Sequence, residues 1–150
     1  MSMTTSTTST IALAYKGYWR ESNAGGVPNE SGIYSVYACT HDRVAGTVSI
    51  RKLLYIGESA SVRDRIRQHL SGATGRSWKK HLRAGEVLCF AFAPNSGTTR
   101  ERAEAALIYR HKPTENTEYV RSFPARWSPT TVKTGGKNKL LSSHFTVRSS

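Results

Sequence analysis

The side chains of this sequence that could act on a charged substrate are concentrated between residues 55 and 69. Tyr55 lies near the end of an apolar run, and Arg65 and His69 follow it in a stretch whose apolar residues recur at helical spacing. Residues four apart share one face of a helix, so Arg65 and His69 are expected to project together toward the strand end that carries Tyr55. A phenol, a guanidinium and an imidazole would then meet at one place.

The elements that position these groups can be predicted from the local pattern. Residues 53–57 are typical of a strand, and Ser61 with Asp64 three residues later resembles a capping box, which predicts a helix start near Ser61. Residues 32–39 form a second predicted strand, and with residues 52–57 they would make an antiparallel hairpin. The connection, residues 40–51, is expected to be a long loop, and a strand extension at 47–50 is the alternative for its second half.

Three further elements follow along the chain. Residues 77–83, which include Lys79 and Lys80, predict a short basic helix, and residues 86–93 a third strand. Thr98 with Glu101 forms another capping-box pattern, which opens a helix that must end before Pro113. The predicted order is therefore strand, strand, helix, short helix, strand, helix.

The two ends differ in composition from this middle part. Residues 1–14 predict a disordered tail rich in Ser and Thr, and residues 15–118 a single domain with an N-terminal lead-in. Residues 119–150 contain no Asp or Glu, and they predict a basic extension that lies on a phosphate backbone, with Lys137 among its cations and a short strand at 140–147. Solubility is the alternative explanation of this charge.

Overall charge indicates the class of partner. The 150 residues carry a formal net charge of +12, which favours a polyanion, first nucleic acid and second an anionic membrane surface. No apolar run is long enough to cross a membrane, so a soluble, cytoplasmic protein is expected.

Cys39 and Cys89 fall within predicted strands, and we expect them to be buried free thiols.

Two tripeptides give the chain a resemblance to a known family. Gly32-Ile33-Tyr34 followed by Tyr55-Ile56-Gly57 resembles the GIY-YIG nuclease superfamily. The resemblance extends in order and spacing to four later residues and covers residues 31–116; the four are Arg65, His69, Glu104 and Asn116. Each tripeptide alone is weak, but the ordered set is specific.

The resemblance implies both a fold and an activity. Members have an α+β fold in which a small three-stranded antiparallel sheet is flanked by helices, and they cut phosphodiester bonds with one bound divalent cation, Mg²⁺ or Mn²⁺. By resemblance, Glu104 would hold the cation, which suits Mg²⁺ because this ion keeps several of its waters. Arg65 would stabilise the charge of the transition state, and the site would lie on the sheet face between the hairpin and the two helices.

The identity of the general base stays open at this stage. The resemblance implies that Tyr34 accepts or orients the proton of the attacking water and that Tyr55 fixes its position. A free phenol titrates near ~10, so His69 is the alternative base, or the group that relays the proton of Tyr34. Glu58 departs from the family pattern, where many members carry Lys or a small polar residue, and it would either join the metal site or point away.

Structural explanations compete with several of these roles. Tyr34 and Tyr55 could pack across the hairpin, and Glu101 rivals Glu104 as the metal ligand. Asn116 would contact substrate or brace the site. The remaining predicted substrate contacts are Gly57, which serves backbone geometry, and the cations Arg63, Lys79, Lys80 and Lys137, which contact phosphates or are simply solvated.

The sequence thus predicts a compact, metal-dependent endonuclease that acts on DNA. A restriction-like enzyme would read bases and form a homodimer to cut both strands. A structure-selective or nonspecific nuclease of repair or mobile elements is one alternative, and a nucleic-acid-binding module with a degenerate site is another. Charge does not distinguish DNA from RNA as the substrate.

Overall fold

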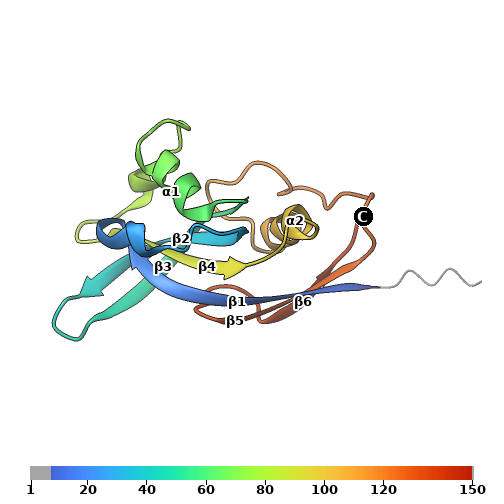
Figure 1. Ribbon diagram of the computed structural model, residues 1–150, viewed down its shortest axis with the longest axis horizontal. Coiled ribbons are helices and arrows are strands. Elements are labelled where there is room, and N and C mark those ends of the chain that lie inside the picture. The colour runs from blue at the N-terminus through green and yellow to red at the C-terminus, as the bar shows by residue number, and fades with distance from the viewer. Residues whose placement is uncertain (1–7, 150) are drawn as a thin grey trace, which may run out of the picture.

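Six strands form one curled, mixed sheet in the computed structural model, which describes residues 8–149 (Figure 1). The sheet order is β3-β2-β4-β1-β5-β6, and every neighbouring pair is antiparallel except β1 with β5. The strands are β1 (Ser9–Arg20), β2 (Gly32–Asp42), β3 (Thr47–Ser59), β4 (Val87–Pro94), β5 (Thr130–Gly136) and β6 (His144–Val147). The helical elements are η1 (Glu21–Gly26), α1 (Val62–Leu70), η2 (Trp78–His81) and α2 (Arg100–His111).

The α+β class is confirmed, but the predicted sheet of three strands is wrong. β1 is a central strand between β4 and β5, and its alternating side chains Ile11, Leu13 and Tyr15 are buried. Figure 1 shows β1 running along most of the length of the molecule. A period of two with one buried side is typical of a strand, so residues 11–15 carried a usable signal.

The predicted basic extension, residues 119–150, contributes to the sheet. β5 and β6 pair with each other, and β5 joins the sheet beside β1. Phe123, Val132 and Phe145 of this segment are buried in the main core. Of the predicted disordered tail, residues 1–7 lie outside the described residues, whereas residues 9–14 belong to β1.

Two hydrophobic cores lie on opposite faces of the sheet. Ile33 and Tyr37 of β2 belong to the core that also buries α2, whereas Tyr34 and Val36 belong to the core that buries α1. Because successive strand residues point to opposite faces, α1 and α2 cover opposite faces. Placing the site on one sheet face between both helices was therefore wrong.

The β2–β3 hairpin has a short turn instead of the predicted long loop. The ladder reaches Asp42 and Thr47, with register shifts after Val36 and after Ala38, so the suggested extension at 47–50 is correct. Asp42 fixes the turn, because its Oδ1 accepts hydrogen bonds from the amides of Val44 and Ala45, each at 3.0 Å.

The helix limits were predicted more accurately than their caps. α1 begins directly after Ser61, but the side-chain oxygen that accepts from the Asp64 amide belongs to Asn29, at 3.1 Å. α2 ends before Pro113 as predicted, yet Thr98 and Glu101 form no capping box, and Glu101 pairs with Arg126 instead. A tertiary partner displaced the local interaction in both helices.

Cys39 and Cys89 form a disulfide, so the expectation of free thiols was wrong. Both cysteines are fully buried in strands, as predicted, but β2 and β4 are adjacent, and their register brings the two Cα atoms to 6.3 Å. The pairing of these strands is a tertiary feature that local sequence does not contain.

In residues 8–149, no helix has the length and apolarity that a membrane crossing requires.

Candidate functional site

A pocket of about 290 Å³ at the outer edge of β3 is lined by four of the five predicted catalytic residues and by Asn116. Tyr34 and Tyr55 come from the hairpin, Arg65 from α1, Glu104 from α2 and Asn116 from the segment after α2. The two helices lie on opposite faces of the sheet. Arg65 and Glu104 nevertheless line the same pocket, because β3 is the edge strand and their side chains meet beyond its free edge. The predicted convergence of an acid and a guanidinium is therefore present, although its position is different.

Gly57 makes room for Tyr34. The two residues are direct partners in the β2–β3 ladder, and a Cβ built at Gly57 would overlap the Tyr34 ring. The missing side chain lets the phenol lie across β3 toward the pocket. The absence of a side chain at Gly57 thus has a steric role.

His69 lies behind Tyr34 and does not line the pocket. The Tyr34 hydroxyl is 3.0 Å from Nε2 of His69, and Nδ1 of the same ring is 2.5 Å from Oγ1 of Thr74. Burial, followed by the charges of Arg65 and Arg76, lowers the pKa of His69 to about 4. The imidazole is therefore neutral at physiological pH and can accept a proton at one nitrogen.

Both phenols are protonated at neutral pH. Burial raises the pKa of Tyr34 well above its usual value, and the charges of Tyr55 and Glu104 add to the rise while Arg65 opposes it. Burial also raises the pKa of Tyr55, against the lowering effect of Arg76. A proton leaving Tyr34 therefore needs an acceptor within reach, and His69 is in that position.

Glu104 is held in an unfavourable environment for a carboxylate. Burial raises its pKa to about 8, and the nearby carboxylates of Glu58, Glu118 and Glu101 contribute in that order. Among the residues described, Glu104 forms no ion pair. A cation at this carboxylate would relieve both the burial and the repulsion.

This donor set fits one hydrated divalent cation and no tighter metal cage. Within residues 8–149, no group of three or more His, Cys, Asp or Glu side chains is arranged to hold a metal. A single carboxylate is compatible with Mg²⁺, which retains waters and takes substrate oxygens. Glu104 is the residue that would hold it, and its rival Glu101 is exposed and bonded to Arg126 and Tyr119.

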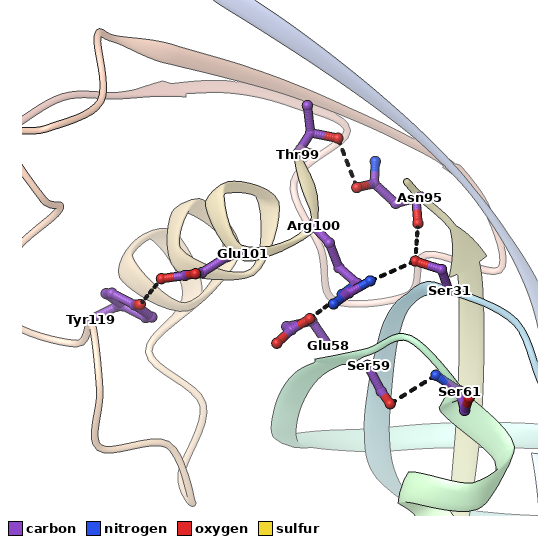
Figure 2. A network of polar contacts seen from close by, with 9 residues as sticks. All are labelled: Ser31, Glu58, Ser59, Ser61, Asn95, Thr99, Arg100, Glu101 and Tyr119. Carbon is purple, nitrogen blue, oxygen red and sulfur yellow. Dashed lines mark hydrogen bonds and ion pairs between the residues drawn. The ribbon is translucent and has the colours of Figure 1, made fainter. Parts of the chain in front are cut away.

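Glu58 both lines the pocket and forms an ion pair with Arg100 (Figure 2). Arg100 also donates to Oγ of Ser31 at 2.8 Å, and Ser31 in turn donates to the carbonyl oxygen of Asn95 at 2.7 Å. This network ties the end of β3 to the first turn of α2, one turn before Glu104. Arg100 neutralises the acid that departs from the family pattern.

Arg76 is a pocket residue that no pattern in the sequence indicated. Its guanidinium lies 4.7 Å from the centre of the Tyr55 ring and donates to the carbonyl oxygen of Glu115 at 3.2 Å. Thr74 and Trp78, which contact His69, were missed as well. All three lie in or beside an irregular connection, where spacing predicts no common face.

The comparisons with known proteins agree with this geometry. The family described as the GIY-YIG catalytic domain matches residues 32–118 of the chain. The chain belongs to the GIY-YIG family. It is also 33% identical over 103 residues to the UvrABC system protein C of Haloarcula marismortui, an alignment that covers 67% of this chain and 16% of that protein. The chain thus spans only a small part of that relative, and no solved structure matches it.

Asn116 of the GIY-YIG domain is a brace for the edge strand. Its side-chain amide accepts from the backbone amide of Ile56 and donates to the Ile56 carbonyl oxygen, both at 2.9 Å. The Glu115 amide donates to the Leu54 carbonyl oxygen at 2.8 Å. These bonds hold the segment after α2 against β3 and use both polar ends of the Asn116 side chain.

The four predicted phosphate contacts lie away from the pocket of the GIY-YIG domain. Lys79 forms an ion pair with Glu21 at 2.7 Å, and Lys80 lies 3.5 Å from Glu115. Arg63 lies 3.4 Å from the carbonyl oxygen of Gly25, and Lys137 is exposed after β5. The structure does not bring these cations together with Glu104.

Proposed function

We propose that this GIY-YIG domain is an endonuclease that hydrolyses DNA phosphodiester bonds with one Mg²⁺ or Mn²⁺ ion. The observation that carries the proposal is the presence of Glu104, Arg65, Tyr34 and Tyr55 in the lining of one pocket. Such hydrolysis needs an activated water and a counter-charge for the transition state. These residues supply both functions.

Each side chain has a definite task in this proposal. Glu104 holds the cation, which when bound would act as a Lewis acid at the phosphate and the leaving oxygen. Arg65 binds non-bridging phosphate oxygens and stabilises the charge that develops on them. Tyr55 orients the attacking water from the neighbouring strand.

Tyr34 and His69 act in sequence on the proton. The Tyr34 phenol lines the pocket, whereas His69 lies behind it and reaches the substrate only through Tyr34. Tyr34 therefore accepts the proton of the attacking water as its own proton passes to Nε2 of His69. Thr74, at 2.5 Å from Nδ1, fixes the orientation of the imidazole.

Cleavage of duplex plasmid with and without Mg²⁺ tests the activity. We expect Glu104→Gln and Arg65→Ala each to lower the rate by about 100-fold or more. Matched controls are Glu30→Gln, an exposed acid outside the candidate pocket, and Arg67→Ala, an exposed arginine on α1, which should cut at nearly the parental rate. Parental rates for both site variants would refute the assignment.

The fragment pattern tests the finer role. A restriction-like homodimer should give discrete fragments and a concentration-dependent rate. A structure-selective or nonspecific nuclease should give a smear, or should prefer branched substrates. Cleavage of RNA but not DNA would contradict the proposed substrate.

A further inference from the structure

A series of hollows continues from the candidate site to the β2–β3 hairpin. Arg76 lines both the candidate pocket and a second hollow beside Trp78, and Lys79 lines that hollow and a third one of about 640 Å³. Arg20 and His41 line the third hollow and a fourth, which reaches Lys137. Shared lining residues mean that these hollows adjoin one another along the surface.

The charge along this path changes from acidic to basic. Four glutamates line the candidate pocket, where a cation is expected. Glu21 and Glu86 line the third hollow, but each is paired, with Lys79 and Arg51 respectively. Among the described residues, the cations along the path that form no ion pair are Arg76, Arg20, Arg43 and Lys137, and we call the surface lined by these four and Lys79 the basic groove.

The hairpin tip is free to meet a partner at the far end of the basic groove. Arg43 is exposed, Val44 is 99% exposed, and Asp42 holds the turn in one conformation through two amide hydrogen bonds. In Figure 1 the hairpin extends from the end of the molecule opposite the marked C-terminus. Arg43 therefore presents its positive charge at a fixed, projecting position.

The length of the path matches duplex DNA. β3 runs from the hairpin tip to the candidate pocket and has 13 residues, which at strand geometry span roughly 40 Å. One turn of B-form DNA measures about 34–36 Å. Phosphates one turn apart on a duplex face the same side, so both ends of the groove can contact one bound duplex.

We propose that the basic groove binds the backbone of duplex DNA about one helical turn from the scissile phosphate, with Arg43 contacting a phosphate at the hairpin tip. The inference rests on the proposed function, because it locates the rest of the same substrate. Charge complementarity with phosphate and continuity with the candidate pocket support this occupant.

Binding measured as a function of salt tests the groove without any cleavage. Fluorescence anisotropy in EDTA with a 30-base-pair duplex should give a linear fall of log affinity with log salt. Arg43→Ala should weaken binding and lower this slope by about 0.9, the value for one phosphate contact on B-DNA. The control is Arg148→Ala, which removes the same charge beyond β6 at the opposite edge of the sheet and should leave the slope nearly unchanged.

The possible results separate this inference from the proposed function. A protein that cuts DNA but shows equal slopes for wild type and Arg43→Ala overturns the groove alone. If the protein does not cut DNA but Arg43→Ala alone loses affinity and salt slope, the basic groove is supported and the proposed nuclease activity is refuted. An equal loss for Arg148→Ala, or the same dependence on Arg43 with single-stranded DNA, would overturn the placement of duplex DNA.

Discussion

The Tyr34 hydroxyl lies 3.0 Å from Nε2 of His69, and this contact joins the candidate pocket to a neutral, buried imidazole. We expect His69→Ala to lower the single-turnover rate by about 10²- to 10⁴-fold at unchanged DNA affinity, because the Tyr34 proton loses its acceptor. Thr74→Val should have a smaller effect, since it only frees the imidazole to rotate. A parental rate for His69→Ala would remove the imidazole from the proton path.

The same histidine should make stability depend on pH. Its pKa is lowered from an ordinary value of 6.5 to about 4, so between these values the unfolded chain binds more protons than the folded one. The free energy of unfolding should therefore fall as the pH is lowered through this window, by at most about 1.4 kcal/mol per pH unit for this group.

Urea unfolding between pH 4 and 7 measures this dependence. His111, whose pKa is also lowered by burial, acts in the same direction, so the comparison must be between wild type and His69→Gln. The variant should show the shallower pH dependence. Equal slopes for the two proteins would contradict the lowered pKa of His69.

Gly57→Ala should be destabilising although the change is a single methyl group. The new Cβ would overlap the Tyr34 ring, which has no free space in the buried hairpin, and overpacking of this kind costs about 1–3 kcal/mol. Gly135→Ala in β5 is the matched control, because its Cβ meets nothing within 4 Å. Thermal unfolding of both variants provides the comparison, and equal losses would argue against a steric role for Gly57.

Asn116→Ala should lower the free energy of unfolding and leave the affinity of the folded protein for DNA nearly unchanged. Truncation leaves the Ile56 amide and carbonyl without their partner, at a cost of about 1–3 kcal/mol. Thr114→Ala, an exposed position two residues earlier, should be nearly neutral in the same unfolding measurement. A stable Asn116→Ala variant with weakened DNA binding would restore the substrate role that the sequence suggested.

Much of the central fold could be predicted from local patterns. The hairpin strands, α1 after Ser61, β4 and the end of α2 before Pro113 each depend on spacing, propensity or a breaker within a few residues. β5 was missed because Thr130–Gly136 contains three threonines and two glycines, a composition without a clear apolar period. Its burial comes from pairing beside β1, which is distant in sequence.

The sequence by itself determined which chemical groups are present, their order along the chain and the strongly basic charge. Tertiary structure decided that Arg65 and Glu104 meet around the edge of β3, that Cys39 bonds to Cys89, that Asn116 braces Ile56, and that Arg76 joins the pocket. The physical reason is the distance along the chain over which each kind of interaction acts. Side-chain spacing fixes the faces of a single strand or helix, whereas the choice of neighbouring elements depends on burial and hydrogen bonding between residues far apart in the chain.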